Sequence, residues 1–218
     1  MSVQLYYFDG RGRAEVIRII LAATGVEYTE VDFTEKEKWE EIKKGGKVLF
    51  GQVPLLEIDG LNLVQTGAIV RYLARKYNLY GNNDKEATII DMYYEGTRDF
   101  YTNAFLGLVF MDEATLLKKA KDVLMPKYLP VYEKILESSS GKYLTGDNMT
   151  FADFGLLEVL LLLEEFFGME SFDMYPKLKE YYKKLKALDR IATFLNGPQR
   201  KKKNDEPYVA TVKHILYG

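Results

Sequence analysis

The sequence predicts an α+β protein in which a mixed four-stranded sheet and its helices are followed by an all-helical region. Residues 3–80 alternate short strand patterns with helical patterns, whereas the chain after the polar segment Tyr80–Asp84 has a helical pattern throughout. The 218 residues are 47% hydrophobic and 28% charged, which is ordinary for a protein with a buried core. We therefore expect two domains, residues 1–80 and residues 84–218.

The N-terminal region begins with a strand, a helix and a second strand. Residues 3–8 alternate as a strand, and residues 14–24 place apolar side chains on one helical face before Gly25 ends the helix. Residues 27–33 have the second strand pattern. Because a helical crossover between consecutive strands makes them parallel, these two strands are expected to form a parallel pair.

The next elements complete this domain. The charged segment 35–44 reads as a helix, and residues 53–64 read as a hairpin, followed by a helix over 68–77. Asp59-Gly60 marks the hairpin turn, since both residue types tolerate the positive φ of a two-residue turn. The order β-α-β-α-β-β-α then requires parallel and antiparallel pairs in one sheet, as in a thioredoxin-like domain.

The hairpin region also offers a place for a ligand. Pro54 lacks an N–H donor and opens its strand, so that edge is available to something other than another strand. Gln65-Thr66-Gly67 lies where the next helix begins, and its amide, hydroxyl and backbone N–H groups suit a carboxylate. Alternatively, Thr66 only caps its helix, and the spacing alone does not separate these interpretations.

The second domain is expected to consist of helices. Helical patterns cover residues 85–110, 114–137 and 150–167, with shorter helices after Pro176. Pro126 and Pro130 should kink or break the second of these. Thr150 and Asp153 have the spacing of a capping box, which predicts a helix start. The run 154–167 is apolar nearly all round, so it should be the central buried helix.

Composition excludes several classes of function. The chain has no cysteine, which excludes disulfides, thiolate metal sites, a Cys-x-x-Cys redox pair and a cysteine nucleophile. The net charge of −2 argues against a nucleic-acid surface, and we interpret the basic run 200–203 as a solvated linker. The single histidine, His214, is expected on the surface. We expect no metal, no membrane span and a cytoplasmic location.

Several motifs together resemble cytosolic glutathione S-transferases over essentially the whole chain. They are, in order, Tyr7–Arg13 (Tyr-Phe-Asp-Gly-Arg-Gly-Arg), Gln52-Val53-Pro54, Gln65-Thr66 and Thr150-Phe151-Ala152-Asp153. The segment 90–99 and the tail 194–217 resemble the alpha class, whereas the segment 39–43 resembles the sigma class. The resemblance implies a thioredoxin-like domain followed by a helical domain, with glutathione as cosubstrate.

The resemblance also assigns roles to individual residues. Tyr7 would hydrogen-bond the glutathione sulfur, and Arg13 beside it would favour the thiolate, which is the nucleophile. Trp39 either contacts glutathione or fills a gap beneath its helix. The other implied glutathione-binding residues are Lys43, Gln52, Val53, Pro54 with a cis peptide bond, Gln65, Thr66 and, from a second subunit, Asp99.

The implied activity is addition of the glutathione thiolate to apolar electrophiles, as in detoxification. A homodimer is implied, in which Phe50 inserts into the helical domain of the partner. The electrophile pocket would consist of Phe8, Gly10, Phe105, Leu106, Val212 and Leu216, with the terminal helix as a lid. Two alternatives stay open: a glutathione-dependent isomerase of steroids or prostaglandins, and a non-catalytic carrier of hydrophobic ligands or lens-type structural protein.

Overall fold

The computed structural model describes residues 2–106 and 111–218. These residues form two compact units, which we call the N-terminal unit (Met1–Leu73 with Thr193–Gly218) and the helical unit (Ala74–Ala192). The sequence predicted that residues 84–218 form one domain. In the structure, the contacts of Thr193–Gly218, which we call the tail, group it with the N-terminal residues.

The N-terminal unit contains a four-stranded sheet with the order β2-β1-β3-β4. Its strands are β1 (Val3–Phe8), β2 (Tyr28–Phe33), β3 (Leu55–Ile58) and β4 (Leu61–Val64). Strand β1 pairs in parallel with β2 and antiparallel with β3, which pairs antiparallel with β4. The predicted mixed sheet is therefore confirmed. Asp59 and Gly60 turn the hairpin with φ of 53° and 80°, as the two-residue turn requires.

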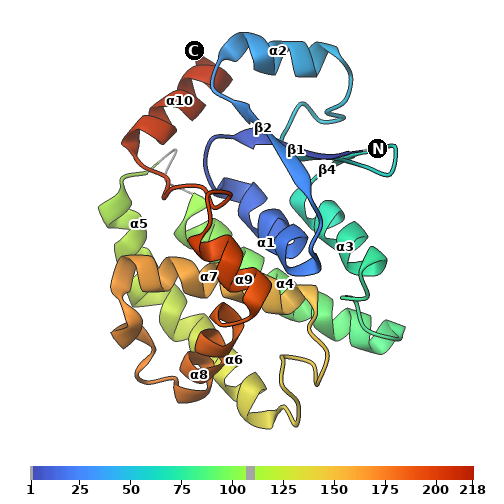
Figure 1. Cartoon of the computed structure of the whole chain (residues 1–218). Helices are drawn as coiled ribbons and strands as arrows, with labels where there is room; N and C mark the ends of the chain where they lie inside the picture. Colours follow the sequence, from blue (N-terminus) through green and yellow to red (C-terminus); the bar gives the residue numbers. More distant parts are fainter. Residues whose placement is uncertain (1, 107–110) are drawn as a thin grey trace. The chain divides into compact units, whose positions relative to one another are not determined.

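Three helices accompany this sheet: α1 (Glu15–Thr24), α2 (Lys36–Lys44) and α3 (Thr66–Lys76). Figure 1 shows α1 and α3 on one side of the sheet and α2 on the other. Helix α1 buries Ile17, Ile20 and Leu21 completely, and Gly25 ends it in the left-handed conformation. The charged helix α2 buries Trp39, which anchors it to the unit.

The tail ends in helix α10 (Glu206–Tyr217), which lies beside α2 (Figure 1). The side chain of Asp205 caps α10 by accepting the N–H of Tyr208 at 2.9 Å. Val212 and Ile215 are buried, whereas His214 is exposed, as expected. The terminal helix therefore packs through one apolar face on the other elements of the N-terminal unit.

The helices of the helical unit follow the expected order with one interruption. They are α4 (Asp84–Ala104), α5 (Glu113–Lys119), the π-helical turn Ala120–Leu124, α6 (Met125–Ser138), α7 (Phe151–Phe167), the 3₁₀ turn Met169–Phe172, α8 (Pro176–Lys186) and the first half of α9 (Asp189–Asn196). The π-helical turn comes directly before Pro126, because proline lacks the N–H that an α-helical turn needs there. Pro130 lies within α6. Residues 107–110 of the expected helix 85–110 lie outside the described residues.

The predicted capping box starts helix α7. Asp153 is fully buried, and its carboxylate accepts the N–H of Thr150 at 2.6 Å and that of Leu144 at 3.0 Å. The hydroxyl of Tyr181 on α8 also donates to this carboxylate. Asp153 therefore joins the start of α7 to a preceding loop and to a neighbouring helix.

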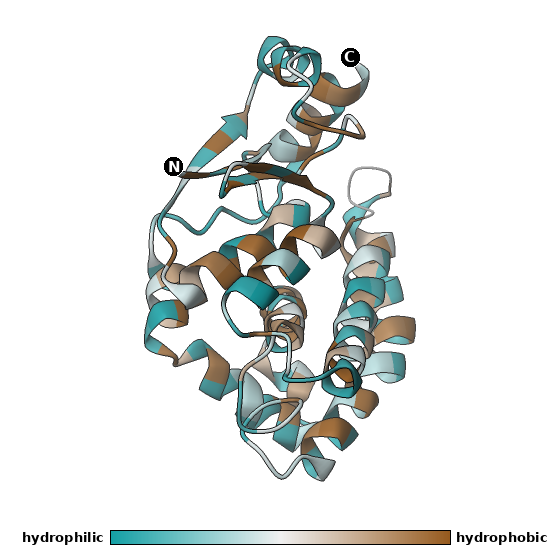
Figure 2. Ribbon diagram, turned by 90° about the vertical axis from the view of Figure 1, so that its right-hand side faces the viewer, coloured by the Kyte–Doolittle hydropathy of each residue, from teal (hydrophilic) through white to brown (hydrophobic). Residues whose placement is uncertain are grey.

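The helices of both units are amphipathic, as the mixed teal and brown ribbons of Figure 2 show. Helix α7 is the exception expected from its sequence, since it is buried on nearly all sides. In the part of the chain that the structure describes, no helix combines the length and apolarity needed to cross a bilayer. The same residues contain no cluster of His, Asp or Glu that could hold a metal ion.

Candidate functional site

Tyr7 lies near the end of β1 and is surrounded by the loop that follows this strand. Its side-chain oxygen accepts the backbone N–H of Arg13 at 2.9 Å. Gly12 has a φ of +42°, and a Cβ built there would lie 2.4 Å from the Tyr7 oxygen. Only glycine at position 12 permits this close approach of the Tyr7 hydroxyl to the loop.

The surroundings of Tyr7 keep its phenol protonated. Burial raises the pKa of Tyr7 above its ordinary value. The N–H of Arg13, the charges of Arg13 and Arg18, and the hydroxyl of Tyr208 act in the opposite direction but do not cancel the effect of burial. At neutral pH, Tyr7 is therefore a hydrogen-bond donor, and its oxygen is already held by the N–H of Arg13.

Arg18 was not among the predicted site residues, although it supports the Tyr7 loop. Its side chain is fully buried on α1, and its guanidinium lies 6.0 Å from the centre of the Tyr7 ring. It pairs with Glu30 at 2.6 Å and donates to the carbonyl of Gly10 at 2.9 Å. In the sequence, Arg18 lies within the apolar pattern of α1. An arginine in such a place could have been identified as functional or structural, because a buried arginine requires partners.

The predicted glutathione-binding residues of the hairpin region lie beside the Tyr7 loop. The hydroxyl of Thr66 at the start of α3 donates to the carbonyl of Arg13 at 3.2 Å. The amide of Gln65 donates to the side-chain oxygen of Gln52 at 3.1 Å. The Val53–Pro54 peptide bond is cis, as the resemblance implied. These contacts place the Thr66 hydroxyl beside Arg13 and the Gln65 amide beside Gln52.

Trp39 and Lys43 lie together on α2. Trp39 is 3% exposed, and its ring centre lies 5.5 Å from that of Phe33. The ammonium of Lys43 is 2.6 Å from Glu40 and 5.3 Å from the centre of the Trp39 ring. This burial favours the interpretation in which Trp39 fills a gap beneath its helix, and it leaves the half-exposed Lys43 as the polar group on this face.

The predicted electrophile-pocket residues are divided between the two units. Phe8, Gly10, Val212 and Leu216 belong to the N-terminal unit, and Phe105 and Leu106 belong to the helical unit together with the exposed Asp99. Phe8 and Val212 are buried, whereas Leu216 is 40% exposed.

Tyr208 was not among the predicted site residues, and its ring lies against Gly10. A Cβ at Gly10 would lie 2.2 Å from Cε2 of Tyr208. The Tyr208 hydroxyl acts to lower the pKa of Tyr7, against the larger effect of burial. Burial raises the pKa of Tyr208. A glycine at position 10 was the available signal, because it leaves room for another group to approach the backbone.

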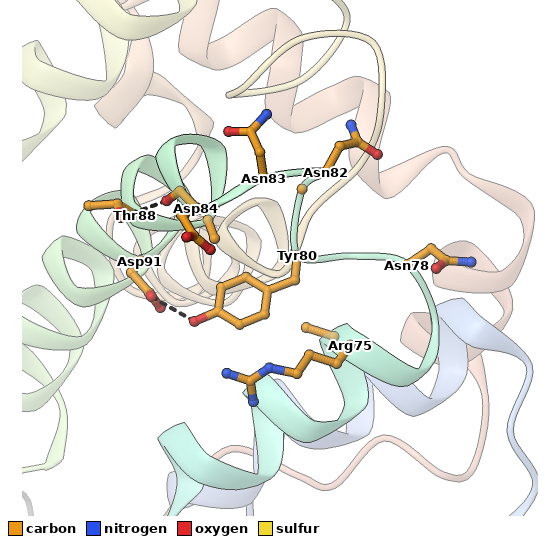
Figure 3. A pocket seen from close by; sticks show the side chains of 11 residues that line it. Arg75, Asn78, Tyr80, Asn82, Asn83, Asp84, Thr88 and Asp91 are labelled. Atoms are coloured by element: carbon orange, nitrogen blue, oxygen red, sulfur yellow. Dashed lines mark hydrogen bonds between the residues drawn. The ribbon is translucent and has the colours of Figure 1, made fainter.

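A polar pocket lies in the helical unit, between the end of α3 and the start of α4 (Figure 3). The Tyr80 hydroxyl donates to Asp91 at 2.6 Å, and the guanidinium of Arg75 lies 4.8 Å from the centre of the Tyr80 ring. None of the predicted site residues lines this pocket. Arg75, Tyr80 and Asp91 are thus in contact with one another, as in a structural polar cluster.

Two family models match the chain. Residues 3–75 match the glutathione S-transferase N-terminal domain, and residues 98–198 match the glutathione S-transferase C-terminal domain. The chain belongs to the glutathione S-transferase family. This transferase is 41% identical to "Glutathione S-transferase A4" of Mus musculus over 98% of its own length and 97% of that protein.

Further relatives agree with this family. Over 97% of the chain and 93% of the relative, it is 40% identical to "Glutathione S-transferase 3" of Gallus gallus. It is also 42% identical to "Glutathione S-transferase alpha-4" of Rattus norvegicus, over 98% of the chain and 97% of that relative. The pi-class glutathione S-transferase structure of Onchocerca volvulus superposes with a TM-score of 0.80 at 30% identity, covering 93% of this chain and all of that one. The predicted fold and family are confirmed.

Proposed function

We propose that this transferase joins the sulfur of glutathione to apolar electrophiles, with Tyr7 and Arg13 as its catalytic residues. The observation that carries the proposal is the buried Tyr7 hydroxyl, whose oxygen accepts the N–H of Arg13. Burial raises the pKa of Tyr7, so we expect the hydroxyl to keep its proton. A group in this state donates a hydrogen bond to sulfur without itself losing a proton. The named relatives are glutathione S-transferases, so the isomerase, carrier and structural alternatives are not favoured.

The hydrogen bond from Tyr7 makes the thiolate available near neutral pH. A free thiol has a pKa of about 8.5, and the thiolate is its reactive form. Lowering this pKa by about two units corresponds to about 2.7 kcal/mol. One hydrogen bond to an anion together with a nearby arginine can supply this amount. With an aryl chloride, the sulfur forms the carbon–sulfur bond, chloride leaves, and the thiol proton passes to solvent.

The other groups of the Tyr7 region would bind the rest of glutathione. Gln65 and Thr66 present an amide and a hydroxyl at the start of α3, where free backbone N–H groups suit the γ-glutamyl carboxylate. Lys43 and Gln52 would reach the glycyl carboxylate, and the backbone of Val53 before Pro54 would pair with the cysteinyl part. For Trp39 there are two roles, contact with glutathione and packing beneath α2, and its burial supports the second.

The apolar cosubstrate would contact the residues that the resemblance assigns to the electrophile pocket. These are Phe8, Gly10, Phe105, Leu106, Val212 and Leu216. Binding both reactants in one pocket converts a reaction between two solutes into a reaction within a complex.

We also propose a cytoplasmic homodimer in which Phe50 contacts the partner. Phe50 and its neighbour Leu49 are 62% and 77% exposed, which is unusual for two adjacent large apolar side chains. In the helical unit, Met92 and Val131 are 64% and 52% exposed. The residues that follow them in the chain are joined, because the Tyr132 hydroxyl donates to the carbonyl of Tyr93. Met92 and Val131 would therefore offer one apolar surface for Phe50.

A conjugation assay with chlorodinitrobenzene tests the proposed function. Purified protein should form the glutathione adduct, and the rate should saturate with both reactants. A panel of apolar electrophiles and of isomerase substrates would then identify the preferred chemistry. Binding of apolar dyes without turnover of any panel member would contradict the catalytic proposal and favour a carrier.

A further inference from the structure

The basic run 200–203, expected to be a solvated linker, includes a lysine that is held by two carboxylates. The ammonium of Lys201 lies 2.9 Å from Asp9 and 2.6 Å from Asp32, and the Lys201 side chain is only 15% exposed. Burial acts to lower the pKa of Lys201, but the bonds with Asp32 and Asp9 raise it above its ordinary value. Lys201 is therefore charged at every working pH.

The backbone around Lys201 is bound as well. The guanidinium Nε of Arg11 donates to the carbonyl of Lys201 at 2.9 Å, and the Arg11 N–H donates to the side chain of Asn204 at 3.1 Å. We call Asp9, Arg11, Asp32, Lys201 and Asn204 the tail clasp. It joins the tail to the end of β1, to β2 and to the loop that ends at Arg13.

The tail clasp lies directly before the segment that reaches Tyr7. Helix α10 begins at Glu206, and the ring of Tyr208 in its first turn lies against Gly10, three residues from Tyr7 along the chain. The absence of a side chain at position 10 leaves the space that the Tyr208 ring occupies. Two independent features, the ion pairs of Lys201 and the space above Gly10, thus place the same helix in the same position.

We propose that Lys201 is a positioning residue that docks the tail before the electrophile binds, by holding residues 201–204 so that Tyr208 lies beside Tyr7. This inference rests on the proposed function for its effect on catalysis. A helix of about 12 residues is marginal by itself, so an unclasped tail would have to be ordered when the electrophile binds. A clasp that orders the tail in advance removes this cost from electrophile binding.

The test compares Lys201→Met with Lys202→Met in the full-length protein. Both variants remove one positive charge from the same run, but Lys202 is exposed. Hydrogen exchange of residues 206–217 measures docking of the tail without any reaction. In Lys201→Met, we expect faster exchange there and a Michaelis constant for chlorodinitrobenzene raised about threefold or more. The Michaelis constant for glutathione should stay unchanged, and Lys202→Met should match the wild type in every measurement.

Ionic strength provides a second measurement. Because salt screens partly exposed ion pairs, the Michaelis constant of the wild type for chlorodinitrobenzene should rise with salt, whereas that of Lys201→Met should change much less. Unchanged exchange in Lys201→Met would overturn the proposal, and so would faster exchange with an unchanged Michaelis constant. If the wild type conjugates nothing, the proposed function fails, and the exchange measurement alone then decides whether Lys201 docks the tail.

Discussion

At the scale of single residues, the position of one hydroxyl depends on several groups in and beside one loop. The Arg13 N–H donates to the Tyr7 oxygen, and the absence of a side chain at Gly12 lets this oxygen approach the loop. The guanidinium of Arg18 donates to the carbonyl of Gly10. Each of these groups acts on the loop between β1 and α1. The chemistry expected of Tyr7 therefore depends on the conformation of this loop as much as on the tyrosine itself.

Replacing Tyr7 by Phe should leave a folded protein that binds glutathione but conjugates it at least about tenfold more slowly near pH 7, because only the bond to sulfur is lost. Thiolate absorbance of bound glutathione should titrate at a higher pH in the variant. The difference from wild type should shrink as pH rises through the thiol pKa, since the thiolate then forms without help. An unchanged titration and rate would remove Tyr7 from the mechanism.

At the scale of elements, the start of α7 and the docking of α10 differ in how firmly they are held. Asp153 is fully buried and joins three segments, whereas α10 is held by a short apolar face and by the clasp before it. We therefore expect α7 to belong to the most stable part of the helical unit and α10 to exchange its amide hydrogens much earlier.

Replacing Asp153 by Ala should lower the free energy of unfolding by about 2 to 4 kcal/mol, since it leaves two buried N–H groups without their acceptor. Urea unfolding measures this change. Asp147→Ala is the matched control, because Asp147 is an exposed aspartate in the preceding loop. A loss in Asp153→Ala no larger than in this control would show that the capping box is dispensable.

Deleting residues 208–218 should raise the Michaelis constant for apolar electrophiles much more than that for glutathione. The deletion removes two buried side chains, Val212 and Ile215, but also the entropic cost of ordering a helix. The thermal unfolding midpoint should therefore fall by no more than about 5 °C. Equal losses for both reactants, or a much larger drop in the midpoint, would make α10 part of the core instead.

At the scale of the whole molecule, the exposed side chain of Phe50 is the proposed contact of a homodimer. Phe50→Asp should weaken the homodimer, because a charge would be buried in an apolar contact. Glutathione affinity should fall with it, since Asp99 is proposed to act across the subunit interface. Sedimentation at several concentrations measures the first effect and calorimetry the second. Met174→Asp, another exposed apolar position, serves as the control. A monomeric wild type would contradict both assignments.

The sequence by itself determined the elements whose causes are local. Strand alternation, the Asp59-Gly60 turn and the capping box at Thr150 depend on neighbours within a few residues, and the structure confirms them. The absence of cysteine excluded a whole class of chemistry in the same direct way. The roles of Tyr7 and of the hairpin residues came from resemblance, because spacing alone does not distinguish a catalytic tyrosine from a packing one.

Only the tertiary structure showed the contacts of the tail and the partners of buried charges. Lys201 is far from Asp9 in sequence, and Tyr208 is as far from Gly10, so no local pattern could reveal these pairs. The basic run looked solvated because composition describes charge but not what lies opposite it. Likewise, Arg18 is a charged residue within an apolar helical pattern in the sequence. Only the folded structure shows its partners, Glu30 and the carbonyl of Gly10. Long-range pairing decides which charges are buried, and it forms only when the chain has folded.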